Sequence, residues 1–166
     1  MTDGEFKRIL LPQYRQMYAT AFAILRDPDD ASDAVQDTIS ALWQKHKRMV
    51  VPENVGAFCN RTIRNHCIDR IRQNSNRFFD RITSLYLMIP SDTSTDSEAS
   101  FTSTSSLIMK YLAQLNERYR KVLTLSIFSQ LSNNEISDAT GESPENVRVI
   151  LSRGRKTIKE FLKNEK

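Results

Sequence analysis

Glycine and proline are scarce in this chain of 166 residues, which contains only four glycines and five prolines. β-Sandwiches and glycine-rich nucleotide-binding loops depend on such residues at their turns, so both are disfavoured and helices are favoured. No apolar run approaches the roughly 18 residues that a membrane-spanning helix needs. The N-terminus also lacks the apolar stretch of a signal peptide. We therefore expect an all-α protein that works in the cytoplasm without inserting into a membrane.

Cysteine and histidine, which often serve in metal binding and catalysis, occur only twice each. Cys59 and Cys67 would lie about 12 Å apart on one helix at 1.5 Å per residue, which is too far for a disulfide bond. The spacing of these cysteines and of His46 and His66 matches no standard zinc finger. No catalytic triad or carboxylate pair stands out either. We therefore expect two buried thiols in a reducing compartment, with no metal, no cofactor and no enzymatic activity.

Acidic and basic residues are unevenly distributed along the chain, although its net charge is only +4. Residues 1–50 contain seven acidic and seven basic side chains. Residues 57–78 contain five arginines against one acid, and residues 142–166 contain seven basic against four acidic side chains. Two separate basic regions indicate a polyanionic partner, and the acids nearer the N-terminus indicate a second, basic partner.

Residues 90–106 read PSDTSTDSEASFTSTSS, and 11 of the 16 residues from 91 to 106 are serine or threonine. Such a segment buries too little apolar surface to offset its ordering entropy. We predict a flexible linker over 90–106 between two small helical domains, 1–89 and 107–166. The alternative, a long surface loop within one domain, is less favoured because unstructured loops of this length are uncommon. The second domain begins with predicted helices over 107–115 and 117–130, the latter capped by Asn116.

Apolar residues recur at helical spacing through the N-terminal half. Between residues 6 and 25 this pattern predicts helix, with Pro12 near a start or a kink. Asp27 is a favourable N-cap and Pro28 suits the first position of the next helix. The predicted buried residues of that helix are Ala31, Val35, Thr38 and Leu42. A third long helix is predicted over about residues 54–78, and its predicted buried stripe is Cys59, Ile63, Cys67 and Ile71.

Capping signals predict two short helices and a sharp turn near the C-terminus. Ser132 and Glu135 form a capping box at the start of the first helix, and Gly141 can adopt the left-handed backbone that ends it. Ser143 and Pro144 are favourable at the N-cap and the first position of the second helix. Two short helices joined by a tight turn form a helix-turn-helix.

The second helix of this motif is predicted to be amphipathic, with mostly apolar residues on its inner side and mostly polar and cationic residues on its outer side. The predicted inner residues are Val147, Leu151, Gly154, Ile158 and Leu162. The predicted outer residues, which are candidates for DNA binding, are Asn146, Arg148, Val149, Ser152, Arg153, Arg155 and Lys156. A helix-turn-helix can project such a face into a DNA major groove, where arginine bonds to guanine or to phosphate. The alternative is an ordinary solvated face of a helical bundle.

Two further polar faces lie in the N-terminal half. An acidic face on the helix after Pro28 suits a basic partner; its residues are Asp30, Asp33, Gln36 and Asp37. No local cation is evident to neutralise Asp33 or Asp37. The following helix carries arginines beside an aromatic and an amide residue, opposite its buried stripe, which suits single-stranded DNA. The candidates there are Phe58, Arg61, Arg64, Asn65, Arg70 and Arg72. The alternative for both faces is solvated surface.

Three segments together resemble the extracytoplasmic-function (ECF) group of bacterial sigma factors: DPDDASDAVQDTISALW (27–43), VGAFCNRTIRNHCIDRIR (55–72) and LNERYRKVLTLSIFSQLSNNEISDATGESPENVRVILSRGRKTIKEFL (115–162). They occur in the family's order and spacing and cover nearly the whole chain outside the linker. The resemblance implies a protein without catalytic activity that binds core RNA polymerase and promoter DNA. The first domain would bind the polymerase clamp and open the minus-ten element as a melted strand, and the second would read the minus-thirty-five element as duplex. An anti-sigma factor is also implied as a partner.

The resemblance assigns the acidic face to the coiled coil of the polymerase clamp. It also matches the loop from Lys47 to Asn54 with the segment that receives a base flipped from the minus-ten element, an extraction that costs a few kcal/mol. Lys47, Arg48 and Asn54 therefore join the candidates for contacts with the melted strand.

The chain departs from the family's pattern at several positions. Phe58 stands where the family usually has tryptophan, and Thr62, Ile63 and His66 also differ locally, so the family's base preference does not carry over. Ile150 stands where the family often has arginine, and because it falls near the inner face we expect it to pack.

Two other classes of function remain as alternatives. One is a stand-alone helix-turn-helix regulator whose N-terminal domain senses a signal or dimerises. Such a domain needs neither an acidic helix nor a basic-aromatic helix, and this chain has both. The other is an enzyme acting on nucleic acid, which would need metal-binding carboxylates in a basic cleft. Asp69 alone does not supply them.

Overall fold

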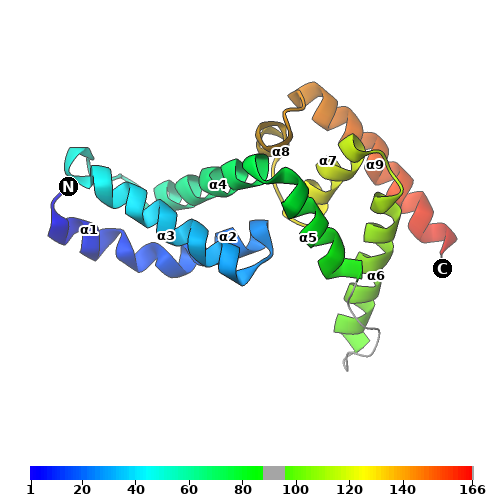
Figure 1. Cartoon of the computed structure of the whole chain (residues 1–166), viewed down its shortest axis with the longest axis horizontal. Coiled ribbons are helices and arrows are strands. Elements are labelled where there is room, and N and C mark those ends of the chain that lie inside the picture. The colour runs from blue at the N-terminus through cyan, green and yellow to red at the C-terminus, as the bar shows by residue number, and fades with distance from the viewer. Residues whose placement is uncertain (88–95, 166) are drawn as a thin grey trace. The chain divides into compact units, whose positions relative to one another are not determined.

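The computed structural model describes residues 1–87 and 96–165, and for residues 96–103 it describes the backbone alone. In these ranges every regular element is a helix (Figure 1), which confirms the predicted all-α fold. The chain forms two compact units, Met1–Gln73 and Asn74–Lys166. Each unit has its own helices and its own core.

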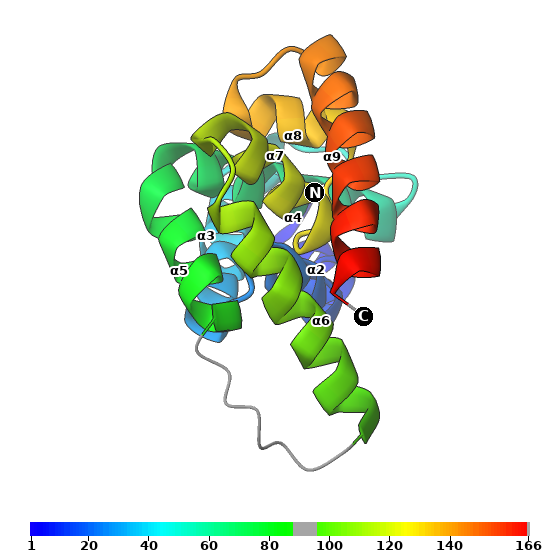
Figure 2. The same cartoon turned by 90° about the vertical axis from the view of Figure 1, so that its right-hand side faces the viewer.

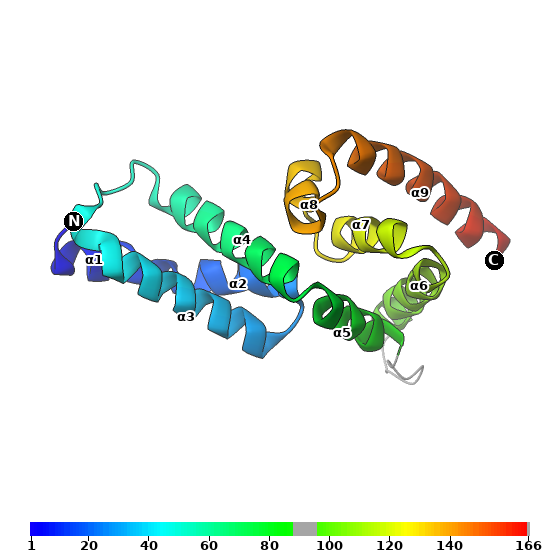
Figure 3. The same cartoon turned by 45° about the horizontal axis from the view of Figure 1, so that its top comes forward.

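The first unit is built around three long helices. They are α2 (Tyr14–Leu25), α3 (Pro28–Lys45) and α4 (Val55–Gln73), and the shorter elements are α1 (Asp3–Ile9), η1 (Leu11–Gln13) and η2 (His46–Arg48). α2 packs against both α3 and α4, and α3 also packs against α4, as Figure 3 shows. The largest fully buried side chains of this unit are Phe6, Met17, Ile24, Leu42, Ile63 and Ile71.

Local sequence signals form as predicted in the first unit. Pro12 lies in η1, between α1 and α2. The Asp27 side chain accepts a hydrogen bond from the Asp30 backbone N–H, and Pro28 occupies the first turn of α3. The four predicted inner residues of α3 are all buried, and so are both cysteines. Burial raises the pKa of Cys67 to about 12, so this thiol stays protonated at neutral pH.

The long helix predicted over residues 54–78 is instead two helices, because α4 ends at Gln73 and α5 (Ser75–Leu87) begins two residues later. Residues 73–76 read Gln-Asn-Ser-Asn, and asparagine and serine side chains compete for backbone hydrogen bonds, which weakens a continuing helix. α5 buries Phe78, Phe79, Ile82 and Tyr86 in the second unit. That unit therefore contains a helix that the sequence had placed in the first domain.

The second unit contains α5, α6 (Asp96–Ala113), α7 (Glu117–Ile127), α8 (Asn133–Thr140) and α9 (Pro144–Asn164). α6 packs against α5, α7 and α9. The helices α7, α8 and α9 also pack on one another (Figure 2). Fully buried side chains at their centre are Met109, Leu112, Leu123, Leu125 and Ile136. Tyr86 of α5 packs on Phe128, with ring centroids 4.3 Å apart.

Part of the predicted linker is helical. Residues 96–106 belong to α6, whereas residues 90–95 lie outside the described residues. Ser105 is buried, and Ser106 Oγ donates a hydrogen bond of 2.8 Å to the carbonyl oxygen of Tyr86. The backbone of residues 96–106 is thus helical where the sequence predicts a flexible linker, and at Ser105 and Ser106 the second unit provides the surroundings that a buried or bonded polar side chain needs.

Candidate functional site

The turn between α8 and α9 has the geometry of the predicted helix-turn-helix. Ser132 and Glu135 make both bonds of a capping box at the start of α8. α8 ends at Gly141, whose φ of 81° lies in the left-handed region that favours glycine. The Ser143 hydroxyl caps α9, and Pro144 occupies its first turn. The predicted caps and turn are confirmed.

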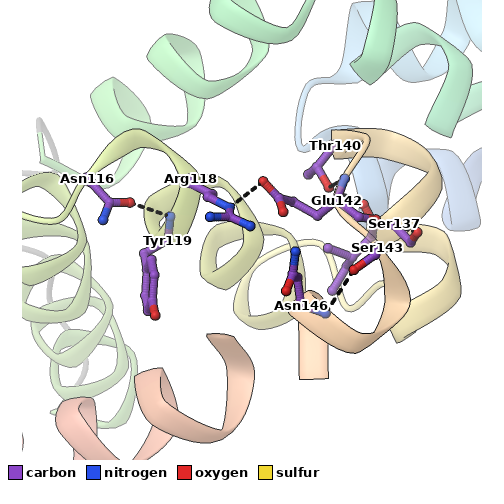
Figure 4. Close-up of polar contacts among 9 residues, drawn as sticks. Asn116, Arg118, Tyr119, Ser137, Thr140, Glu142, Ser143 and Asn146 are labelled. Carbon is purple, nitrogen blue, oxygen red and sulfur yellow. Dashed lines mark hydrogen bonds and ion pairs between the residues drawn. The ribbon is translucent and has the colours of Figure 1, made fainter. Parts of the chain in front are cut away.

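Three hydrogen bonds hold Glu142 between the two helices (Figure 4). Ser137 Oγ donates to the Glu142 carbonyl oxygen at 2.6 Å, and the Glu142 N–H donates to Thr140 Oγ1 at 3.2 Å. Arg118 Nε, from the first turn of α7, donates to Glu142 Oε1 at 2.6 Å. This last bond holds the pKa of Glu142 below its ordinary value, so the ion pair persists at neutral pH. Sequence reasoning missed the pair, because its members lie 24 residues apart with no local pattern to join them.

A groove of about 460 Å³ lies beside this ion pair. Its lining residues are Asn116, Glu117, Arg118, Tyr119, Lys121, Thr140 and Glu142. Both of its cations have acidic partners, since Lys121 Nζ lies 2.8 Å from Glu117 Oε1 and Arg118 bonds to Glu142. The groove therefore presents no net positive charge to an anion.

The inner face of α9 approaches α7 unusually closely. A Cβ atom on Gly154 would lie only 2.5 Å from Leu123 Cδ2 and 2.7 Å from Leu123 Cδ1. Glycine is therefore what allows the two helices to pack at this distance. Ile150 is 3% exposed and packs inward, as expected. The other buried residues of this face are Val147, Leu151 and Ile158.

The outer face of α9 leaves all seven candidate residues exposed. Among the described residues, the one acid beside Arg148 is Glu145 of its own helix, whose Oε1 lies 3.6 Å from Arg148 Nη2. Arg155 Nη2 donates a hydrogen bond of 3.2 Å to the neutral hydroxyl of Ser126. Within the described part of the chain, the Arg153 guanidinium has no acidic partner. The structure thus brings these residues together on one face whose positive charge is not cancelled by another helix.

The acidic face of α3 is less open than the sequence indicates. Asp33, Gln36 and Asp37 are exposed, and Asp30 is half-buried. Contrary to expectation, Asp37 has a cationic neighbour on α4: Arg70 Nη1 lies 3.3 Å from Asp37 Oδ2. The other terminal nitrogen of Arg70 lies 3.8 Å from Asp30 Oδ1. The sequence concealed these contacts because 33 residues separate Asp37 from Arg70.

His66 lies next to this group of charges. Its Nε2 is 4.0 Å from Asp37 Oδ2. Desolvation and the nearby positive charge of Arg70 lower the pKa of His66, although Asp37 and Asp69 act in the opposite direction. The imidazole is therefore mainly neutral at pH 7.

The candidates for melted-strand contacts divide into two groups. Lys47, Arg48, Arg61 and Asn65 are exposed. The others have contacts within the protein. Phe58 and Arg64 are half-buried, and Arg70 pairs with acids of α3. Arg72 lies 2.5 Å from Asp69 on its own helix. Asn54 is exposed, but its side chain also accepts a hydrogen bond of 3.0 Å from the Ala57 N–H and so caps α4.

The start of the loop 49–54 is held by His46, which is buried. Its Nε2 lies 2.7 Å from Asp3 Oδ1, and its ring stacks on Trp43 with centroids 4.2 Å apart. The hydrogen bond lowers the pKa of Asp3. A groove of about 480 Å³ lies here, lined by Asp3, Trp43, Gln44, Lys45, His46, Lys47 and Arg48. The sequence carries no signal for this link between α1 and the end of α3.

Comparison with known families accounts for both helical units. The family model described as Sigma-70 region 2 matches residues 12–77, and that described as Sigma-70, region 4 matches residues 105–158. The chain belongs to the ECF group of the sigma-70 family. The region 2 match runs from η1 into α5, and the region 4 match includes the helix-turn-helix.

Two known proteins illustrate the similarity. The sigma factor is 27% identical to the RNA polymerase sigma factor SigV of Bacillus subtilis over 152 residues, which are 91% of this chain and 87% of that protein. It also aligns with the sigma factor RpoE of Bartonella quintana, solved in complex with the anti-sigma factor NepR. That alignment has 23% identity and a TM-score of 0.41, and it covers 98% of this chain and 99% of the other. None of the helices described for this sigma factor is long and apolar enough to cross a membrane.

Proposed function

We propose that this protein binds core RNA polymerase through α3 and directs it to promoters through α4 and α9. The observation that carries the proposal is that one chain contains both region 2 and region 4 and that each bears helical faces of suitable charge. A transcription initiation factor of this kind performs no catalysis itself and works in the cytoplasm. The stand-alone regulator is disfavoured, because the N-terminal unit belongs to region 2 instead of to a sensor or dimerisation domain.

In the proposed complex, α9 enters the major groove of the minus-thirty-five element. The turn at Gly141, the Arg118–Glu142 pair and the close packing on Leu123 fix its direction relative to α7. Arg148, Arg153 and Arg155 then face the DNA, and among the described residues no acid of another helix competes for their charge. Bidentate arginine contacts with guanine would specify sequence, and contacts with phosphate would set the register.

The first unit has the two remaining roles. Asp33, Gln36 and Asp37 present acceptor oxygens to a basic clamp, which favours encounter and correct orientation. Arg61 and Asn65, together with the loop that starts at Lys47, face the melted strand. The functional boundaries that we propose are residues 1–89 for clamp binding and melting, 90–106 as the connection, and 107–166 for duplex reading, although α5 packs in the second compact unit and residues 96–106 are helical.

We also propose an anti-sigma factor as a protein partner. The support is membership of the ECF group, whose members are usually held inactive by such inhibitors. An inhibitor that covers the acidic face of α3 or the outer face of α9 would block the proposed contacts directly.

Run-off transcription tests the proposed function. Purified core polymerase is incubated with promoter fragments, with and without this protein, and transcripts should start only when it is present. In the variant Asp33→Lys, like charges would meet across the docking surface, which weakens the free energy of binding by several kcal/mol. It should keep its circular dichroism, because exposed substitutions usually change stability by less than about 0.5 kcal/mol. It should nonetheless fail to co-elute with core polymerase.

The control is Asp80→Lys, which reverses the charge of an exposed acid on α5, outside the acidic face of α3. It should bind core polymerase as the wild type does. Wild-type protein that never binds core polymerase would refute the proposed function. Normal binding by Asp33→Lys would instead remove α3 as the docking helix.

A further inference from the structure

Two surfaces that the sequence assigned to different partners share one side chain. Arg70 of α4 is a candidate for DNA, whereas Asp30 and Asp37 of α3 are candidates for polymerase. In the structure both terminal nitrogens of Arg70 lie against these acids, at 3.8 Å from Asp30 Oδ1 and 3.3 Å from Asp37 Oδ2. In the protein without partners, Arg70, a candidate for DNA binding, therefore neutralises part of the acidic face that is proposed to bind polymerase.

The exposure of these groups shows how a partner could enter. The Arg70 side chain is 26% exposed and Asp30 is 24% exposed, so this contact is largely covered. The Asp37 side chain is 63% exposed and open to solvent on its outer side. A cation from another protein can therefore approach Asp37 without unfolding anything. Once there, it competes with Arg70 for the same carboxylate and repels the guanidinium.

Asp33 on α3 and Arg61 on α4 lack this conflict. Asp33 has no cationic partner within the described residues, so a clamp cation can bind to it without displacing anything. Arg61 likewise has no acidic partner there and is available to DNA at all times. Arg72 has a partner on its own helix, with Nη2 2.5 Å from Asp69 Oδ1. Arg70 therefore differs from Arg61 in being held by α3.

We propose that Arg70 couples polymerase docking to promoter binding by exchanging partners. In the free protein it bonds to α3. A cation of the polymerase clamp takes Asp37, and Arg70 then turns toward a phosphate of the melted strand. The proposal deepens the proposed function and rests on it. Because coupling between binding sites is reciprocal, DNA that engages Arg70 must also strengthen polymerase binding.

The test measures the affinity of labelled protein for purified core polymerase. Each titration is repeated with an unlabelled single-stranded oligonucleotide that carries the non-template strand of a promoter active in the run-off assay. Arg70→Ala uncovers the acidic face, so without DNA it should bind core polymerase roughly two- to fivefold more tightly, the modest size expected for exposed ion pairs. The oligonucleotide should then tighten its binding by a smaller factor than it does for the wild type.

Two further variants separate coupling from simpler roles. Arg77→Ala removes an exposed arginine of α5 that is not a candidate for DNA or polymerase, and it should bind core polymerase with wild-type affinity in the absence of DNA. Arg70→Lys keeps a cation at the site and should return the affinity for core polymerase toward the wild-type value. Thermal melting of each variant by circular dichroism checks that the fold is retained.

The outcomes distinguish this proposal from the proposed function. A wild type that binds core polymerase, together with Arg70→Ala of unchanged affinity, overturns the coupling and leaves the sigma function intact. Weaker binding by Arg70→Ala with a lower melting temperature, rescued by Arg70→Lys, shows that the pair only stabilises the unit and also overturns it. Failure of the wild type to bind core polymerase refutes both proposals.

Discussion

Both α4 and α9 carry several arginines, yet the two helices differ in what those arginines contact. On α4, Arg70 and Arg72 lie beside carboxylates of the same unit. On α9, Arg155 bonds to a neutral hydroxyl, and Arg148 has only a loose contact of 3.6 Å with an exposed acid of its own helix. Although both helices are rich in arginine, several arginines of α4 contact carboxylates within the protein, whereas those of α9 remain available to an outside partner.

The backbone beneath the two faces differs as well. α9 is fixed by a tight turn, an ion pair to α7 and a glycine contact, which suits the reading of rigid duplex DNA. α4 continues from a loop, residues 49–54, in which Val50 is 87% exposed.

The largest effect is expected from removing the available charge of α9. The variant Arg148→Ala/Arg153→Ala/Arg155→Ala should lose protection of the upstream promoter element in footprinting by holoenzyme. Each arginine that reads a base pair bidentately contributes about 1–3 kcal/mol, and each phosphate contact contributes less. Lys159→Ala, on an exposed position farther along α9, is the control and should protect normally. Normal protection by the triple variant would show that α9 is not the reading helix.

The next largest effect is expected from Gly154→Ala, because the added methyl group would push α9 away from α7. The added Cβ would overlap the Leu123 side chain, which is fully buried and has little room to move. Overpacking of this kind costs about 1–3 kcal/mol, measured as a lower denaturation midpoint. Gly4→Ala is the matched control, since nothing lies within 4 Å of its added Cβ and alanine favours the helix. An unchanged midpoint for Gly154→Ala would mean that the helices can shift apart freely.

A smaller effect is expected at the Arg118–Glu142 pair. Arg118→Ala and Glu142→Gln should each weaken duplex binding a few-fold, because the turn before α9 loses its link to α7. The double variant should be no weaker than either single variant, since both remove one interaction. Fluorescence anisotropy with a duplex of the upstream element measures all three. Additive losses would show that the two residues act separately, for example through their own contacts with DNA.

The smallest effect concerns His66 on α4. Its lowered pKa means that the folded protein resists protonation there, so the unfolded chain binds the extra proton more readily. The associated stability is present above the ordinary pKa of 6.5 and is lost as the pH falls through the lower folded-state value. His66→Gln should melt with a weaker dependence on pH between 7 and 5 than the wild type. Identical pH profiles would show that Arg70 and burial do not affect this imidazole.

Features that depend on neighbours a few residues away could be predicted from the amino-acid sequence. The caps at Asp27, Asn116 and Ser132 were predictable because each side chain bonds a backbone N–H three residues later. The turn at Gly141 was predictable because few other residues tolerate its backbone angles. Helical periodicity likewise identified the buried sides of α3 and α9. The family resemblance rested on these same local patterns.

Which polar groups meet across helices depends on how the helices pack, and could not be predicted from local patterns. The pairs Arg70–Asp37 and Arg118–Glu142 join residues 33 and 24 positions apart. The tertiary structure also decided that α4 and α5 separate and that residues 96–106 extend α6. Periodicity shows that a side chain points outward, but the charge it meets there depends on which helix the core packs beside it. For this reason the sequence could name Arg70 as a cation and could not assign its partner.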